Sequence, residues 1–318
     1  MSSSSRLKPS PPPRLLVIGS ANVDLCLDLP SLPVPGETLG GGIFRQTFGG
    51  KGANAAVAAA QAGGNVAFVG SVGRDANGGE MVANLRAKNV DVTFLEKHPT
   101  APTGVAFIFI DRHAQNMIGI AAGANAEVAP GRLEALRIQL REASVILVQN
   151  EIPEETVTRL LELAREEGWK ILYNCAPARA VSPRLLAAVE WLILNESEAA
   201  FVSGAPVATL PEAESAARAL LALGVKNVLV TLGADGVCVA RAGEVFHVPA
   251  FKVTPVDTVG AGDIFCGALA VACGEGRELA DAVRFASAAA AISVTRPGAQ
   301  NAAPRREEIE AFLQTHAT

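Results

Sequence analysis

The chain lacks any apolar run near the roughly 18 residues that a membrane-spanning helix needs, and it has no long run of Lys or Arg. Its formal net charge is −5. The negative net charge and the lack of clustered Lys or Arg argue against an anionic membrane or a nucleic acid as the main partner, because such partners bind clustered positive charge. Hydrophobic residues make up 49% of the 318 residues and charged residues 19%, a balance typical of a globular rather than a disordered protein.

Disulfide and metal-binding patterns are missing as well. The four histidines are isolated and have no zinc-binding spacing, which disfavours zinc chemistry. No two cysteines form a Cys-x-x-Cys pair and most lie in apolar segments, so we expect buried thiols in a reducing compartment and a cytoplasmic protein. The five cysteines are Cys26, Cys175, Cys238, Cys266 and Cys273.

Residues 1–13 are rich in Ser and Pro and contain no apolar segment, so they do not form a secretory signal. We expect a disordered tail there. The rest of the chain has no internal repeat and no linker long enough to separate two halves, which predicts one large domain over residues 14–318.

Strand-like and helix-like segments alternate along most of this domain. Short apolar runs predict strands at Arg14–Ser20, Asn65–Val72, Ser144–Gln149, Lys170–Asn174, Trp191–Leu194 and Asn227–Leu232. Longer periodic runs predict helices at Gly52–Ala62, Gly78–Lys88, Arg132–Glu142, Glu154–Glu167 and Glu212–Leu223. Strands that alternate with helices pair in parallel through right-handed crossovers. The pattern therefore predicts an α/β fold, a three-layer α/β/α sandwich with a mostly parallel central sheet.

Two stretches break this alternation. Residues 22–48 are extended and punctuated by Pro and Gly, and within residues 103–121 the segments Thr103–Asp111 and Asn116–Ala121 predict a β-hairpin. Strands without intervening helices predict a small antiparallel sheet set apart from the main one. We favour a lid over the cleft at the carboxyl ends of the parallel strands, where ligands bind; surface hairpins without a function are the alternative.

The segment Gly260–Asp263 follows an extended stretch and opens an apolar helical run. Small residues at a helix start leave backbone N–H groups free to bind an anion, with the positive end of the helix dipole behind them. A carboxylate such as Asp263 beside an anion site can take a proton from a hydroxyl that attacks phosphorus. The alternative is a glycine-rich turn in which Asp263 is an ordinary first-turn acid.

Near the N-terminus, Asn22 and Asp24 follow the first predicted strand, and the turn Gly49–Asn54 begins the first predicted helix. Its glycines let the backbone approach a ligand, while Lys51 and Asn54 supply donors. Amide and carboxylate groups here suit a ligand with many hydroxyls. The turn is not a Walker motif because Gly52 stands where Ser or Thr is required. Simple turn chemistry is the alternative for Asn22 and Asp24.

Three further segments have both a structural and a functional interpretation. Glu151 follows a predicted strand and either faces the cleft or serves as a first-turn acid of the next helix. Asn195 and Glu198 have the spacing of a capping box, but they also suit a phosphate and Mg²⁺ site. The segment Thr231–Gly236 is either a hairpin turn or a loop whose N–H groups meet nucleotide phosphates.

The ordered set of these segments resembles the ribokinase-like (PfkB-type) family of carbohydrate kinases, from about Leu15 to Phe312. Gly49–Asn54 and Asp257–Asp263 match its specific motifs. Three further segments resemble the ribokinase branch of the family, namely Ala122–Asn125, Ala176–Arg179 and Arg296–Gln300. The resemblance implies ATP-dependent phosphorylation of D-ribose at O5 to D-ribose 5-phosphate, with Mg²⁺ required and K⁺ as an activator. It also implies a homodimer formed through the lid, which would cover exposed strand edges.

The resemblance also assigns roles to residues. Asp263 would be the general base, and the N–H groups of Gly260, Ala261 and Gly262 would form the anion hole. Sugar hydroxyls would be held by Asn22, Asp24, Gly50, Lys51, Asn54, Glu151 and Asp263. The nucleotide and its Mg²⁺ would be held by Asn195, Glu198, Thr231, Gly233, Ala234, Asp235, Gly236 and Gly262. A monovalent cation would be held by Asp257, Val259, Ser293, Arg296 and Gly298.

Other functions agree less well with the sequence. A kinase of the same fold could act on fructose, 2-keto-3-deoxygluconate or a nucleoside; few aromatic residues (5%) are present to clamp a nucleobase. A Rossmann dehydrogenase is disfavoured because Gly260-x-Gly262 is only half of its fingerprint and lies far from the N-terminus. A non-catalytic sugar- or nucleotide-binding protein is disfavoured because Asp263 and the anion hole are both intact.

Overall fold

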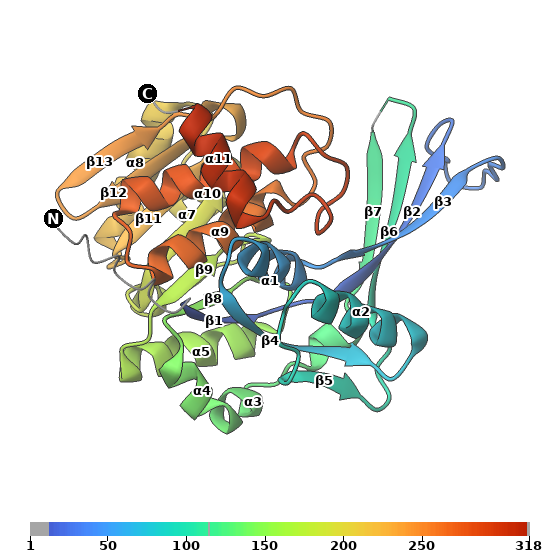
Figure 1. Ribbon diagram of the computed structural model, residues 1–318, viewed down its shortest axis with the longest axis horizontal. Coiled ribbons are helices and arrows are strands. Elements are labelled where there is room, and N and C mark those ends of the chain that lie inside the picture. Colours follow the sequence, from blue (N-terminus) through green and yellow to red (C-terminus); the bar gives the residue numbers. More distant parts are fainter. Residues whose placement is uncertain (1–12, 114, 317–318) are drawn as a thin grey trace, which may run out of the picture.

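The computed structural model describes residues 13–113 and 115–316, so the tail expected at residues 1–13 lies outside the described residues apart from Pro13. The strands of the main sheet are β1 (Arg14–Ile18), β4 (Asn65–Gly73), β5 (Leu95–His98), β8 (Val145–Val148), β9 (Ile171–Asn174), β10 (Val189–Asn195), β11 (Asn227–Thr231), β12 (Val237–Arg241) and β13 (Glu244–Val248). They are ordered β13-β12-β11-β10-β9-β8-β1-β4-β5 (Figure 1). The strands from β11 to β5 pair in parallel, and β12 and β13 extend that edge in antiparallel fashion.

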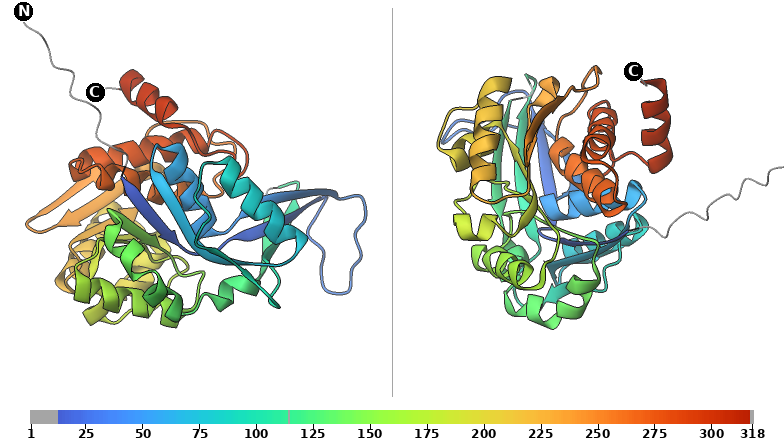
Figure 2. Two further views of the ribbon diagram at one scale, coloured as in Figure 1. Left: turned by 60° about the horizontal axis from the view of Figure 1, so that its bottom comes forward. Right: turned by 90° about the vertical axis from the view of Figure 1, so that its left-hand side faces the viewer.

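Helices cover both faces of this sheet because successive side chains of a buried strand point to opposite sides. Leu15 and Val17 of β1 belong to one core, and Leu16 and Ile18 belong to the other. The first core is covered by α1 (Lys51–Gln61), α2 (Ala76–Ala87), α9 (Ala261–Gly274), α10 (Leu279–Ser293) and α11 (Arg306–Thr315) (Figure 2). The second is covered by α3 (Gly131–Ala135), α4 (Arg137–Glu142), α5 (Glu154–Glu167), α6 (Pro183–Leu186), α7 (Glu196–Ser203) and α8 (Leu210–Ala222). The predicted three-layer sandwich is confirmed.

One predicted helix is interrupted. The single helix expected over Arg132–Glu142 is wrong: α3 and α4 are separated at Leu136, whose φ of −103° and ψ of 13° depart from helical values. Leu133, Leu136 and Leu140 are all buried in the same core. These leucines are spaced by three and four residues, which predicts one continuous helix. In the structure all three side chains are buried in the same core, but the helix is broken at the middle one, Leu136.

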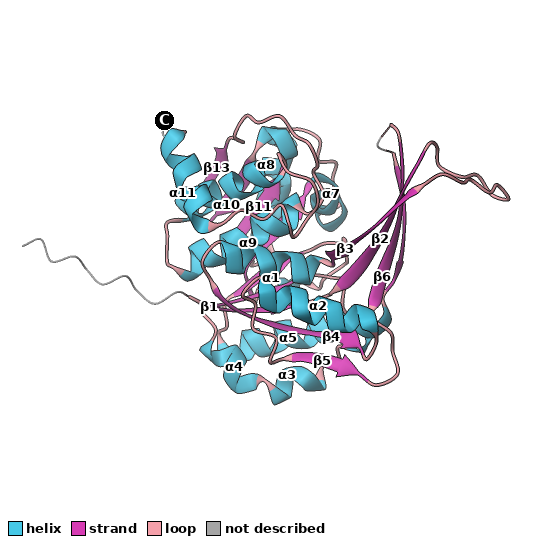
Figure 3. Cartoon of the chain, turned by 45° about the vertical axis from the view of Figure 1, so that its right-hand side comes forward, coloured by secondary structure: helices cyan, strands magenta, loops and turns pink. Residues whose placement is uncertain are grey.

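A second, smaller sheet stands away from the main body (Figure 3). Its strands are β2 (Asn22–Leu29), β3 (Ile43–Gly49), β6 (Gly104–Asp111) and β7 (Asn116–Ala121), in the order β3-β2-β6-β7. The pairs β2–β3 and β6–β7 are antiparallel, as the sequence indicated, and the pair β2–β6 that joins them is parallel. We call this sheet the lid.

The lid exposes large apolar side chains. Between 47% and 66% of their surface is accessible at Ile43, Phe44, Phe107, Met117, Ile118 and Ile120. Elsewhere in the described ranges, Cys175, Cys238 and Cys266 are buried, as is Cys26 within the lid, while Cys273 is half-buried. No helix among the described residues is both long and apolar enough to span a membrane.

Candidate active site

Segments far apart in the sequence meet at the carboxyl end of β1. The start of α1, the start of α9 and the turn after β8 contribute Asn54, Asp263 and Glu151. Asn54 Nδ2 donates a hydrogen bond to Asp263 Oδ2 at 2.8 Å, and the backbone N–H of Lys51 donates to Glu151 Oε2 at 3.0 Å. The structure thus brings together four of the residues that the sequence assigned to the sugar and to catalysis.

Glycines make the close approach of α1 possible. Gly50 precedes the helix with a φ of 86°, and a Cβ there would lie 2.8 Å from the backbone nitrogen of Asn22. A Cβ on Gly52 would lie 2.7 Å from the backbone of Gly19. These contacts leave no room for any larger residue. The turn therefore places Lys51 directly against the chain that leaves β1.

The N-terminus of α9 is open. Gly260 adopts a left-handed conformation, with φ 75°, and a Cβ on it would lie 2.7 Å from the Cβ of Ala299. A Cβ on Gly262, in contrast, would meet nothing within 4 Å among the described residues. None of the described side chains caps the first turn of this helix. The Ala261 N–H makes a long hydrogen bond of 3.3 Å to the Thr258 carbonyl, while the N–H groups of Gly260 and Gly262 have no partner among the described residues. The first turn and the helix dipole are therefore available to an anion.

Asp263 lies in that first turn and is only 6% exposed. Burial raises the pKa of its carboxyl group to about 6, against the lowering effects of the Lys51 charge and of the hydrogen bond from Asn54; the Glu151 charge raises it further. A carboxylate with such a pKa is largely ionised at neutral pH, yet it accepts a proton more readily than an exposed Asp does. Asp263 therefore has the basicity of a general base.

Asp24 lies near the base of the lid, close to the same charges. Burial raises its pKa to about 7, and the negative charges of Glu151 and Asp263 add to the effect. Its carboxylate packs so closely against Gly49 that a Cβ there would lie 2.1 Å from Asp24 Oδ2. Near neutral pH this group can therefore both accept and donate a hydrogen bond, as recognition of a hydroxyl requires.

Lys51 balances these carboxylates. Burial alone would lower the pKa of its ammonium group, but the negative charges of Asp263, Glu151 and Glu198 outweigh burial and raise it. The side chain therefore remains protonated. Its positive charge limits the repulsion within a group of acids that would otherwise disfavour one another's ionisation.

The sequence interpretation missed the partners that orient two of these groups. Asn125, in the 3₁₀ helix Gly123–Glu127, donates from Nδ2 to Asn22 Oδ1 at 2.7 Å and accepts from the backbone N–H of Ala21 at 2.9 Å. Ser20 Oγ donates to Glu151 Oε2 at 2.6 Å. Asn125 belonged to a motif quoted above without a role. Ser20 carried no signal, because a Ser after a strand is common in any turn.

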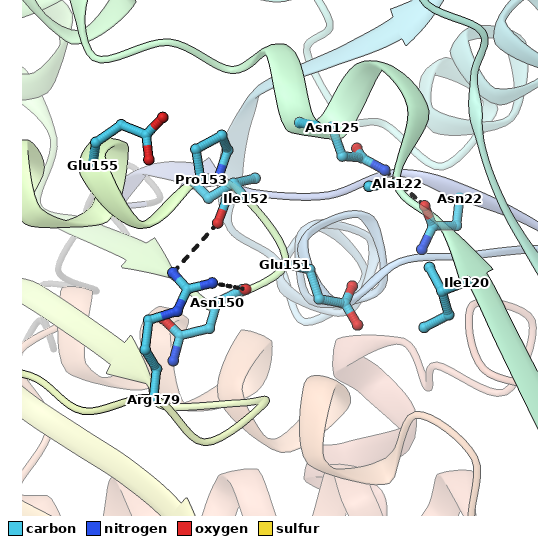
Figure 4. A pocket seen from close by; sticks show the side chains of 11 residues that line it. Asn22, Ile120, Ala122, Asn125, Asn150, Glu151, Ile152, Pro153, Glu155 and Arg179 are labelled. Carbon is cyan, nitrogen blue, oxygen red and sulfur yellow. Dashed lines mark hydrogen bonds between the residues drawn. The ribbon is translucent and has the colours of Figure 1, made fainter.

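A cleft of about 450 Å³ opens beside Asn22 and Glu151 (Figure 4). The lid contributes Ile120 to its wall, and the main body contributes Arg179, whose guanidinium donates to the carbonyl of Asn150 at 3.1 Å. Figure 4 shows the Glu151 carboxylate and the Asn22 amide turned toward the same space. Lys51, Asn54 and Asp263 lie next to Glu151 rather than in the lining of this cleft.

At the predicted nucleotide side, Asn195 and Glu198 form a reciprocal capping box at the start of α7. Asn195 Oδ1 accepts from the Glu198 N–H at 2.8 Å, and Glu198 Oε2 accepts from the Asn195 N–H at 2.9 Å. The structural alternative for this pair is therefore present. Burial raises the pKa of Glu198, against the hydrogen bond from Asn195 and the Lys51 charge, so Glu198 also lies within electrostatic reach of the site.

The segment Thr231–Gly236 links β11 to β12 as the turn of an antiparallel pair, so its hairpin interpretation is correct. Gly236 has a φ of 96°, and a Cβ there would lie 2.2 Å from the carbonyl oxygen of Val248. At Gly233, with φ 53°, no atom of the described residues lies within 4 Å of a Cβ position. The turn is thus packed on one side and open on the other.

Asp257 joins the loop that precedes α9 to the loop that follows α10. Its Oδ1 accepts from the Val259 N–H at 3.0 Å and its Oδ2 from the Gly298 N–H at 2.8 Å. Both carboxylate oxygens therefore accept from backbone N–H groups in this structure. A carboxylate oxygen is also a ligand that hard cations prefer. Within the described ranges, no cluster of three or more His, Cys, Asp or Glu residues is arranged to hold a metal ion.

Comparison with known proteins identifies similar chains. The model of the pfkB family carbohydrate kinases matches residues 12–306. The chain is 37% identical to a ribokinase of Haemophilus influenzae over 94% of this chain and 98% of that protein. It is 35% identical to a deoxyribokinase of Salmonella typhi, again over 94% and 98% of the two chains. The structure of Arabidopsis thaliana ribokinase complexed with ribose and ATP superposes with a TM-score of 0.87 at 31% identity, covering 96% of this chain and 99% of the other.

Proposed function

Because this chain belongs to the pfkB family of carbohydrate kinases, we propose that it transfers the γ-phosphoryl group of ATP to O5 of D-ribose. The products are D-ribose 5-phosphate and ADP. The observation that carries this proposal is the placement of a buried carboxylate, Asp263, in the open first turn of α9. The Asp263 carboxylate, which can accept a proton, therefore lies within one helical turn of the N–H groups that can bind an anion.

In the proposed reaction Asp263 removes the proton from the O5 hydroxyl as that oxygen attacks the γ-phosphorus. The O5–P bond forms while the bond from phosphorus to the bridging oxygen of ADP breaks. The N–H groups of Gly260, Ala261 and Gly262 stabilise the charge that develops on the transferred group. The hydrogen bond from Asn54 holds the Asp263 carboxylate in the orientation it needs.

The acceptor sugar is held on the side of α1 and the lid. Asn22 and Glu151, kept in place by Asn125 and Ser20, offer a donor and an acceptor to ring hydroxyls. Asp24 contributes a group that can do both. Gly50 and Lys51 complete this side, because the Gly50 conformation places the Lys51 ammonium among the carboxylates.

The nucleotide is held on the opposite side. Its phosphates approach α9 past Asn195, and its remaining parts lie along the turn that contains Thr231, Gly233, Ala234, Asp235 and Gly236. Mg²⁺, when bound with ATP, neutralises phosphate charge, and Glu198 is the carboxylate placed to support it through water. A monovalent cation such as K⁺ would be held by the Asp257 carboxylate and the carbonyls of Val259, Ser293, Arg296 and Gly298, next to the anion hole.

Two broader properties complete the proposal. The lid joins two copies of the chain into a homodimer, since six exposed large apolar side chains gather on this one small sheet, as they do at protein–protein interfaces. The protein acts in the cytoplasm, where buried free thiols such as Cys266 persist.

A second acceptor, 2-deoxyribose, is favoured by the similarity to the Salmonella deoxyribokinase. The test is release of ADP from Mg-ATP by the purified protein with D-ribose, 2-deoxyribose, fructose, 2-keto-3-deoxygluconate or adenosine, in K⁺ and in Na⁺. We expect D-ribose to give the highest kcat/KM and K⁺ to stimulate. The Asp263→Asn variant is the control, and its kcat should fall by ~10²–10⁴. Preference for another acceptor would overturn the assignment of the sugar while leaving the kinase chemistry in place.

A further inference from the structure

Helix α2 is tied to the lid at two points, although it carries none of the residues assigned above (Figures 1 and 3). At its N-terminus, Asp75 accepts hydrogen bonds from the backbone N–H of Thr103 at 2.8 Å and from Thr103 Oγ1 at 2.6 Å. Thr103 immediately precedes lid strand β6. Further along the helix, Glu80 Oε2 accepts from Gln46 Nε2 of lid strand β3 at 2.8 Å.

The last turn of α2 reaches a different part of the molecule. There Asn84 donates from Nδ2 to Gln300 Oε1 at 2.7 Å. Gln300 is only 4% exposed, and its Nε2 is buried with no acceptor among the described residues. Asn84 is therefore the only side chain in the described ranges that pairs with this buried amide. Its loss would leave both ends of the amide unpaired, an arrangement that proteins avoid.

Gln300 ends the segment that forms one wall of the anion hole. Its neighbour Ala299 packs against Gly260, so closely that a Cβ on Gly260 would lie 2.7 Å away. Gly298 donates its backbone N–H to Asp257, which in turn accepts from the Val259 N–H just before the hole. A shift of this segment would move the backbone N–H groups that face the transferred phosphoryl group.

We propose that Gln300, held by Asn84, is a positioning residue for phosphoryl transfer. The pair fixes the segment 298–300 against Gly260 and so sets the geometry of the anion hole, and α2 links that geometry to the base of the lid. The inference rests on the proposed kinase activity and extends it to two side chains whose recorded hydrogen bonds are to each other. Neither of them needs to touch the sugar or the nucleotide.

The test compares Asn84→Ala and Gln300→Leu with a control from the same helix and loop. Lys88→Ala is that control: it removes an exposed contact from Lys88 Nζ to Asn301 Oδ1 (3.3 Å) and leaves the buried amide paired. We expect kcat to fall by ~10- to 100-fold in the two test variants, the loss that a small misplacement of reacting groups produces. KM for the sugar should change by less than about threefold, because binding is not the step affected. The control should match the wild type.

Two further variants separate positioning from a merely structural role. Asn84→Gln should recover most of kcat, because its side chain keeps an amide N–H group that can donate to Gln300 Oε1. The double variant with Asn84→Ala and Gln300→Leu should be no slower than the slower single variant, since both remove the same interaction. Thermal unfolding is measured alongside to establish that each variant is folded.

The proposal is overturned if the folded Asn84→Ala and Gln300→Leu variants keep the wild-type kcat, or if Lys88→Ala loses as much. It is also overturned if the folded Asn84→Gln variant is as slow as the Ala variant. An inactive wild-type protein would contradict the proposed kinase function itself, so the two failures are distinguishable.

Discussion

Asp263 combines two properties that conflict in a folded protein. It must be ionised to act as a base, and it is buried where ionisation is unfavourable. Lys51 and Asn54 stabilise the ionised form only in part, because burial still raises the pKa from 3.8 to about 6. The ionised Asp263 carboxylate is therefore incompletely stabilised near neutral pH, which is typical of catalytic carboxylates.

The unfavourable ionisation of Asp263 has a measurable effect on the free energy of unfolding. The pKa of Asp263 is higher in the folded than in the unfolded protein, so its favourable contribution is complete below pH 3.8 and is lost as the pH rises through about 6. Above that pH the loss is on the order of 1–3 kcal/mol. Asp263→Asn cannot ionise and should escape it. We expect the variant to unfold at a higher temperature than the wild type at pH 8, with the difference shrinking toward pH 4.

Thermal unfolding of both proteins across that pH range measures the effect. Lys51→Ala is an informative comparison. Without the positive charge of Lys51, the stability lost between pH 4 and pH 8 should be larger in this variant than in the wild type. If the Asp263→Asn variant is as stable as the wild type at every pH, or less stable at pH 8, then ionisation of Asp263 does not destabilise the folded protein.

The sequence could predict Asp263, Asn54 and Glu151 as site residues, because their residue types and positions indicate their chemistry. It could not predict the residues that orient Asn22 and Glu151. The hydrogen bonds from Asn125 to Asn22 and from Ser20 to Glu151 join residues more than 100 positions apart. Such partners depend on how the chain folds back on itself, which residue type and local spacing do not encode.

At the scale of single elements, the start of α9 offers a matched pair of glycines. Gly262 has open space where a Cβ would lie and needs no special backbone conformation. Gly260 has a φ of 75° and touches Ala299. Replacing each with Ala should therefore have opposite effects on folding, while both changes place a methyl group at the anion hole.

We expect Gly262→Ala to keep or slightly raise thermal stability, because Ala is favoured over Gly in a helix by about 1 kcal/mol. Its kcat should fall by ~10- to 100-fold, since the methyl group occupies the space of the transferred phosphoryl group and crowds N–H donors that are each worth this much or more. Gly260→Ala should lower stability by about 1–2 kcal/mol from its backbone conformation alone, in addition to the clash with Ala299. Measuring kcat and thermal unfolding for both variants tests this. A Gly262→Ala variant with full activity would exclude this surface as the phosphoryl site.

Elements were predictable from sequence where burial follows a simple period. β1, α1, β4 and α5 lie close to their predicted positions, because a short apolar run suits a strand buried on both faces and a longer apolar run suits a buried helix. The break at Leu136 and the parallel pairing of β2 with β6 were not predictable. The first depends on how three leucines fit one core, and the second on a pairing between strands about eighty residues apart along the chain.

At the scale of the whole molecule, the lid contributes Ile120 to the wall of the cleft and is the surface proposed to bind a second copy. Successive side chains of β7 lie on opposite faces of the lid, so Met117 and Ile118 sample both. Each is about half exposed. Burying such side chains between two lids would stabilise a dimer by the hydrophobic effect and would cover the strand edges.

Because Met117 and Ile118 lie on opposite faces, we expect whichever of Met117→Lys and Ile118→Lys lies on the pairing face to convert the dimer to a monomer in sedimentation velocity experiments. A charge buried in an apolar interface is unfavourable. Phe201→Lys is the control: Phe201 is 58% exposed on α7, away from the lid. If both lid variants sediment as the control does, the lid is not the dimer interface.

The central claim is that this chain phosphorylates the O5 hydroxyl of D-ribose with Asp263 as the base. The most direct measurement is identification of the product by ³¹P NMR after incubation with Mg-ATP and D-ribose, with 5-deoxyribose as an acceptor that lacks the reacting hydroxyl. We predict a phosphate ester coupled to the C5 protons of ribose, no ester with 5-deoxyribose, and almost none from the Asp263→Asn variant. Phosphate at another carbon, or an undiminished yield from Asp263→Asn, would contradict the account.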